Sequence, residues 1–161
     1  MRRNKKGSIG DVFYIGILLF VISIFFVLSW LVFGKINTAI QGQPDFSEQG
    51  KAIINNNTGQ FPKLFDGVFL TILVGLWIAT MILAWQIDTH PVFYVLTIIA
   101  AIALVIVTAV LGNTYTTMMA DVQVSEFADD FTIIPFVMRN FVKIMLGMLF
   151  SVAVVMYAKS Q

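Results

Sequence analysis

Long apolar segments alternate along this chain with polar ones, and charged residues stay out of the middle of each apolar segment. A helix needs about 20 apolar residues to cross the hydrocarbon layer of a bilayer. The pattern therefore predicts membrane-spanning helices over approximately 11–33, 67–87, 91–112 and 135–158, separated by polar loops over 34–66 and 113–134. We expect an all-α, polytopic integral membrane protein with four transmembrane helices, and residues 1–161 form one membrane domain.

The first polar segment contains helix signals as well as helix breakers. The first helix is expected to run through Phe33 and to continue as an exposed helix as far as Ile40, because Gly42 and Pro44 then break it. Asp45 or Ser47 is placed to cap a short helix through Ile54. The run Asn55–Gly59 has the composition of a turn. Asp66 is the predicted N-cap of the second span.

The second and third spans are joined by only a few residues, Asp88-Thr89-His90-Pro91. This short connection predicts an antiparallel hairpin, with Pro91 in the first turn of the third span. The third span is expected to end at Gly112-Asn113. The polar segment that follows is acidic, and its interspersed apolar residues predict a helix on the membrane surface. Trp30 and Trp85 lie near span ends, where indole rings favour the interface.

The amino-terminal residues set the expected orientation, because basic residues are retained on the cytoplasmic side. Arg2, Arg3, Lys5 and Lys6 precede the first span, so we place both termini on the cytoplasmic or interior side. Counted over the whole chain, lysine and arginine divide equally, with five on each side, so only this leading cluster orients the chain. A cleaved secretory signal also begins with basic residues. The run 12–33 is longer than a signal core and no small-x-small cleavage site precedes Lys35, which favours a retained signal anchor.

The composition excludes several function classes. The chain is 58% hydrophobic and only 12% charged, so no length remains for a separate soluble catalytic domain. It has no cysteine and a single histidine, His90, which excludes thiolate and multi-histidine metal sites. Hydrolase and nucleotide-binding motifs are missing, and a net charge of +1 does not indicate a nucleic-acid partner. We therefore predict a protein that is not an enzyme and has no cofactor.

Two basic residues at the start of the fourth span form the most interesting charged pair. Arg139 and Lys143 lie four positions apart, hence on one face of a helix. They could form an anion or lipid-phosphate site, or part of an ion path, since ionisable residues inside a membrane are costly. The alternative is that both side chains extend to the lipid headgroups, assisted by Asp129 and Asp130 just upstream.

Small residues recur at helical spacing in three of the spans. Such stripes permit close backbone approach within a bundle or between subunits. The stripes consist of Gly67, Gly75 and Ala79 in the second span, Ala101 and Ala109 in the third, and Gly147 and Ser151 in the fourth.

The basic tip, the tight Asp88–Pro91 connection and the short tail after Lys159 together resemble the small multi-spanning proteins in the internal membranes of lipid-containing icosahedral viruses and phages. This resemblance implies a structural role in a virion membrane, with loops that contact the shell. We therefore expect a non-enzymatic assembly protein whose partners are the lipid bilayer and other membrane or capsid proteins, or further copies of itself.

Two alternatives remain at the level of sequence. One is an accessory subunit of a cellular membrane complex, which the sequence does not distinguish from the first interpretation. The other is a membrane-permeabilising protein, either holin-like or a small channel. That function needs a polar stripe along at least one helix. The residues available for it are Thr71, Thr80, Thr97, Thr108 and Ser151.

Overall fold

The computed structural model describes residues 9–86 and 92–159, and within them all regular structure is α-helical. The basic cluster before residue 7 and the Asp88–Pro91 connection lie outside these residues. The described helices are α1 (Ile9–Gln41), α2 (Glu48–Thr58), α3 (Phe61–Gln86), α4 (Val92–Met119), α5 (Val122–Ala128), α6 (Ile133–Arg139) and α7 (Phe141–Lys159).

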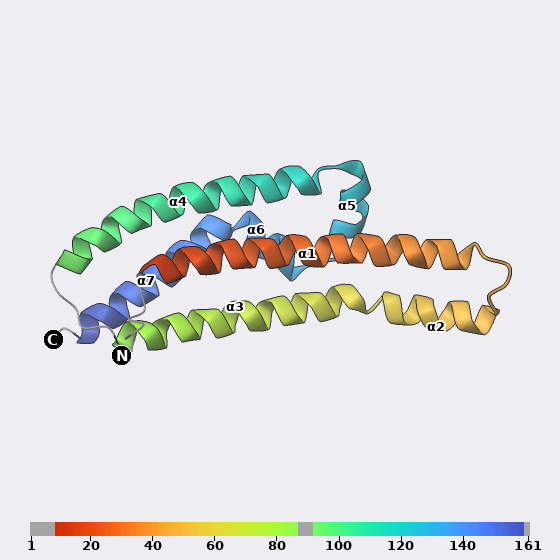
Figure 1. The fold of residues 1–161 in the computed structure, drawn as a ribbon, viewed down its shortest axis with the longest axis horizontal. Helices are drawn as coiled ribbons and strands as arrows, with labels where there is room; N and C mark the ends of the chain where they lie inside the picture. The colour runs from red at the N-terminus through yellow and green to blue at the C-terminus, as the bar shows by residue number, and fades with distance from the viewer. Residues whose placement is uncertain (1–8, 87–91, 160–161) are drawn as a thin grey trace, which may run out of the picture.

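Four stretches of helix are long and apolar enough to cross a membrane, which confirms the predicted fold class. They lie in α1, in α2 with α3, in α4 and in α7, at Val12–Gln41, Glu48–Gln86, Ile99–Met119 and Phe141–Ala158. The chain runs up and down, so that α1 and α4 point one way and α3 and α7 the other (Figure 1). The start of α1 and the end of α7 therefore lie at the same end of the bundle.

Helices that follow one another in sequence are not always neighbours in the bundle. Both α3 and α4 pack against α1 and α7, whereas the described parts of α3 and α4 make little direct contact with each other. The second and third spans are thus antiparallel, as predicted, but they occupy opposite corners of the bundle. A short connection constrains where two helix ends lie, and it leaves the helix bodies free to diverge.

The centre of the bundle is apolar and closely packed. Each spanning helix contributes a side chain with almost no exposed surface: Leu19, Phe69, Leu104 and Met145. The outward surface of the same helices is also apolar, with exposed large side chains such as Phe25, Ile78, Ile106 and Val154. A soluble bundle would present polar residues there, so this outer surface is suited to lipid.

The first polar segment contains the two helical stretches predicted for it, the continuation of the first span and a short helix after the break at Gly42 and Pro44. α1 continues through Gln41, and α2 is capped by Ser47, whose hydroxyl accepts a hydrogen bond from the Gly50 amide at 3.1 Å. The predicted turn at Asn55–Gly59 is right only at its end, because α2 extends through Thr58 and the turn occupies Gly59 and Gln60. Asn37 on α1 donates to the side chain of Asn55 at 3.1 Å, so a partner helix stabilises helical structure in this asparagine-rich run.

The structure also differs from the prediction at two helix ends. Gly112 does not end a helix, since α4 continues through Met119. Gly112 faces the end of α6, where a Cβ atom would lie at an ordinary contact distance of 3.4 Å from the Met138 carbonyl oxygen. The predicted fourth span, 135–158, is divided at Asn140, which lies between α6 and α7 with φ −105° and ψ 20°.

Candidate functional site

A buried carboxylate joins α3 to α6 at the end of the bundle from which α2 extends. Asp66 is only 5% exposed, and its oxygens accept hydrogen bonds from the backbone amides of Thr132, Ile133 and Ile134 at 2.7, 2.9 and 2.9 Å. It was predicted to cap its own helix, but α3 begins five residues earlier, at Phe61. The carboxylate instead satisfies the free amides at the start of α6, where the Thr132 side chain makes no capping bond.

A second contact joins α1 to the segment before α6. The Trp30 indole is 7% exposed, and its Nε1 donates to Oδ2 of Asp130 at 2.8 Å. Trp30 lies near the end of its span as predicted, but its ring faces the protein. Trp85, the other predicted anchor, is exposed in the last turn of α3. The bond to Trp30 holds Asp130 beside α1.

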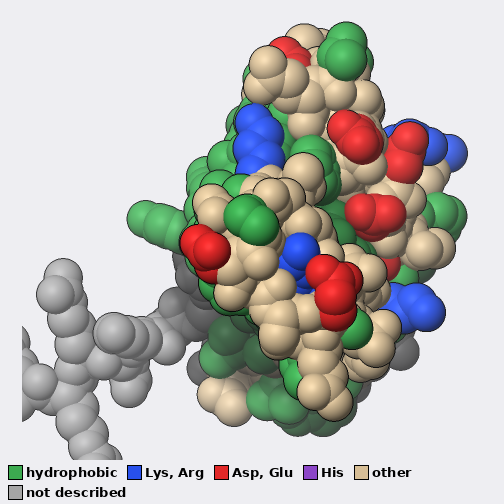
Figure 2. All heavy atoms as spheres, turned by 90° about the vertical axis from the view of Figure 1, so that its right-hand side faces the viewer, with side chains coloured by type: hydrophobic (Ala, Val, Ile, Leu, Met, Phe, Trp, Pro, Cys, Tyr) green, Lys and Arg blue, Asp and Glu red, His purple; other side chains and the backbone are tan. Residues whose placement is uncertain are grey.

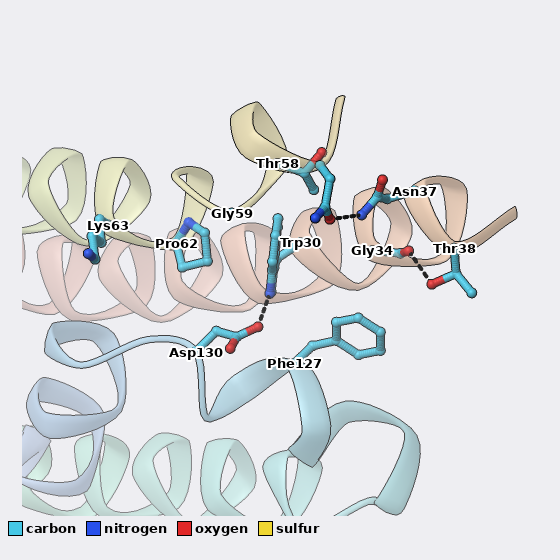
Figure 3. A pocket seen from close by; sticks show the side chains of 11 residues that line it. Trp30, Gly34, Asn37, Thr38, Thr58, Gly59, Pro62, Lys63, Phe127 and Asp130 are labelled. Atoms are coloured by element: carbon cyan, nitrogen blue, oxygen red, sulfur yellow. Dashed lines mark hydrogen bonds between the residues drawn. The ribbon is translucent and has the colours of Figure 1, made fainter. Parts of the chain in front are cut away.

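Trp30 and Asp130 line a pocket of about 410 Å³. The pocket lies between the C-terminal half of α1, the junction of α2 with α3, and α5 (Figure 3). Its lining combines one cation, one carboxylate, amides and aromatic rings, contributed by Lys63, Asp130, Asn37, Asn55, Trp30 and Phe127. In the described part of the chain, Lys63 has no hydrogen bond or ion pair, so its ammonium group is available to a ligand.

The predicted basic pair lies outside this pocket. Arg139 ends α6 and Lys143 lies in the first turn of α7, so the break at Asn140 separates them. Both side chains are exposed, and Lys143 Nζ lies 3.4 Å from the side-chain oxygen of Asn140. Within residues 9–86 and 92–159, neither forms an ion pair with Asp129 or Asp130.

Sequence reasoning missed Tyr115, whose side chain is 1% exposed on the inner face of α4. Its hydroxyl has no hydrogen-bond partner among the residues that the structure describes. A tyrosine in a predominantly apolar helix gives no sequence signal of this kind, because its burial depends on which helices pack against it.

Tyr115→Phe is expected to raise the free energy of unfolding by about 1 kcal/mol, because the substitution removes a buried polar group that has no partner. Thermal unfolding in mild detergent, followed by circular dichroism, measures the change. Tyr14→Phe is the matched control at an exposed site and should leave stability unchanged. A less stable Tyr115→Phe protein would show that the hydroxyl makes a favourable bond after all.

The small residues lie in two different environments. Gly67 and Gly75 face outward: beyond the local backbone of α3, no atom of the described residues lies within 4 Å of a Cβ built on either. Ala79 is also exposed. A Cβ at Gly147 would instead lie 3.6 Å from the Trp77 ring, so this glycine supports the packing of α7 against α3.

The remaining members of the small-residue set are divided in the same way. Ala101 packs against the core and Ala109 is exposed. Ser151 donates a hydrogen bond to the Gly147 carbonyl at 2.8 Å. The outward-facing positions on α3 and α4 therefore have no partner within the bundle described by the structure.

Among the residues that the structure describes, no group of three His, Cys, Asp or Glu side chains is arranged to hold a metal ion. The pocket between α1, the α2–α3 junction and α5 brings Lys63 and Asp130 into one lining and is the candidate site. Comparison with known proteins adds no assignment: no family model, curated protein or solved structure matches this chain.

Proposed function

We propose that this chain is a non-enzymatic assembly subunit of a membrane, which contacts neighbouring proteins through a helical arm formed by residues 34–58. The arm comprises the end of α1, the following turn and α2, and it extends past α5 at one end of the bundle (Figure 1). It is the observation that supports the proposal most directly, because a helix pair beyond the bundle is available to a partner outside the bilayer.

The length of α1 indicates that the arm leaves the hydrocarbon layer. Its 33 residues span about 50 Å at about 1.5 Å per residue, against a layer about 30 Å thick. Viewed end-on, this side of the molecule carries acidic and basic side chains together (Figure 2). Charges of both signs are suited to water or lipid headgroups, and unsuited to hydrocarbon.

The arm is held together by polar contacts and leaves apolar side chains uncovered. Gln41 donates to the Lys51 carbonyl at 3.0 Å, beside the bond between Asn37 and Asn55. Phe46 at the turn is 44% exposed and Ile53 on α2 is 59% exposed. Exposed apolar groups on a polar, membrane-external element favour contact with another protein.

The hydroxyl groups of the spanning helices do not favour the permeabilising alternative. Thr71, Thr80, Thr108 and Ser151 each donate to a backbone carbonyl of their own helix. Side chains bonded in this way offer less to water in a channel. The side chain of Thr97 lies outside those that the structure describes.

The resemblance to virion membrane proteins supports a particular setting for the arm. In a lipid vesicle beneath a capsid, the arm would reach toward the shell, whereas in a cellular complex it would reach toward a neighbouring subunit. Both settings use the same surface, so one experiment tests the proposed contact in either.

The test is recovery of partners from the native membrane or particle in mild detergent, with and without the double substitution Phe46→Ala/Ile53→Ala. We expect stoichiometric partners with the unaltered chain and about tenfold lower recovery with the variant, because truncating central apolar contacts weakens an interface by that order. Phe136→Ala is the control, since Phe136 is also exposed but lies outside the arm.

A vesicle-leakage measurement separates the two function classes. An assembly subunit should leave reconstituted vesicles sealed to a small dye. Recovery of the chain alone or only with itself, together with dye release, would contradict the assembly function and favour the permeabilising one.

A further inference from the structure

We propose that the pocket between α1, the α2–α3 junction and α5 binds the headgroup of a phospholipid that carries a phosphate and a primary ammonium group. The pocket lies at the depth of the lipid headgroups. From Val12 to Trp30 the rise of α1 is about 27 Å, which brings Trp30 to the edge of a hydrocarbon layer about 30 Å thick. The α1 wall of the pocket begins at Trp30 and continues to Thr38, so it lies at headgroup level.

The α3 wall of the pocket lies at the same level. Lys63 is one helical turn before Gly67, where the apolar part of α3 begins, and its side chain is exposed. A lysine at this depth can meet a lipid phosphate without crossing hydrocarbon. Because Lys63 has no protein partner in the described residues, a phosphate would not have to displace one.

The charged side chains that line the pocket favour a ligand that carries both a negative and a positive charge. Lys63 is the only cation and Asp130 the only carboxylate among the residues that line the pocket. Trp30 engages Oδ2 of Asp130, and in the described chain no hydrogen bond is made to Oδ1, which leaves this oxygen for an ammonium group. A primary ammonium donates hydrogen bonds to a carboxylate, which a quaternary ammonium cannot do.

The neutral part of the lining fits the same ligand. Asn37 and Asn55 both line the pocket, and their side chains are bonded to each other at 3.1 Å. Figure 3 shows the Asn37 side chain. Phe127 and Trp30 supply an apolar surface beside them. A volume of about 410 Å³ falls in the range of small-molecule sites.

The test uses the full chain, delipidated in mild detergent and titrated with short-chain phosphatidylethanolamine, phosphatidylcholine and phosphatidylglycerol. Native mass spectrometry counts the bound lipid. We expect one phosphatidylethanolamine per chain, and weaker binding of the other two. Lys63→Gln and Asp130→Asn should each weaken phosphatidylethanolamine binding about tenfold, the loss expected for one charge-assisted hydrogen bond.

The controls make the result specific. Asp130→Asn keeps an oxygen that can accept from Trp30, so it removes charge while preserving that bond. Lys35→Gln removes an exposed lysine of α1 that does not line the pocket, and should leave binding unchanged. Circular dichroism of each variant verifies that the helices are retained.

Three outcomes would overturn the inference. Phosphatidylglycerol binding as tightly as phosphatidylethanolamine would show a site for any phosphate. If Lys35→Gln weakened phosphatidylethanolamine binding as much as Lys63→Gln does, lipid would be attracted to basic charge in general. Competition by soluble phosphoethanolamine at the same concentrations would show that the ligand is a soluble phosphate ester and that no lipid is required.

Discussion

Asp66→Ala is expected to lower the free energy of unfolding by about 3–5 kcal/mol. The carboxylate accepts three backbone hydrogen bonds from the start of α6, and its removal leaves these amides without partners at a largely buried site. Each unsatisfied buried donor costs about 1–3 kcal/mol. Because the bonds join α3 to α6, we also expect α6 to detach before the spanning helices unfold.

Thermal unfolding in detergent measures the loss of stability, and hydrogen exchange at residues 132–134 measures the detachment of α6. Asp66→Asn should lie between the alanine variant and the unaltered chain, since its amide keeps one acceptor oxygen. Asp45→Ala, at an exposed carboxylate, should have almost no effect. Equal stability of Asp66→Ala and Asp45→Ala would show that the cap does not hold α6.

Gly34→Ala is expected to destabilise the protein by about 1–3 kcal/mol, although glycine to alanine inside a helix ordinarily stabilises it by up to about 1 kcal/mol. The reason is the packing of α5 on α1. A Cβ at Gly34 would overlap the Phe127 ring, so the ring must turn or shift away from α1. Because Phe127 lines the pocket, ligand binding should weaken as well.

Gly67→Ala is the matched control, because Gly67 is also helical and a Cβ there meets no atom within 4 Å. It should be neutral or stabilising in the same unfolding measurement. Adding Phe127→Ala to Gly34→Ala should recover part of the loss, since the smaller side chain leaves room for the new methyl group. A stabilised Gly34→Ala protein would mean that Phe127 has another place to pack.

The predicted spans agree with the structure in their number and helical type, and less well at their ends. Length and apolar composition are properties of each segment, so a sequence reveals them directly. The exposed continuation of α1 was also predicted, as far as Ile40, and the helix ends at Gln41. What the sequence does not show is that Asn37 and Gln41 bond to α2. A polar helix of this kind is stabilised by a neighbour that sequence periodicity does not identify.

In the candidate site, too, the sequence shows single residues but not the contacts between helices. Lys63 and Asp130 lie 67 positions apart in the chain, and no motif joins them. Asp130 was predicted as a candidate because it lies just before the fourth span, and Arg139 and Lys143 were its expected neighbours. The structure bonds it to Trp30 of α1 instead. Long-range contacts of this type depend on the order in which helices pack around the core.

The sequence by itself determined that this protein belongs in a bilayer, because each long apolar segment satisfies its backbone hydrogen bonds as a helix. Only the tertiary structure decided that α1 and α7 separate α3 from α4 and that Asp66 caps α6. It also decided that the Tyr115 hydroxyl is buried with no partner in the described part of the chain. The physical reason is that local pattern specifies which faces are apolar, and several arrangements of four apolar helices bury comparable surface. Close contacts such as that of Gly34 with Phe127 select among those arrangements.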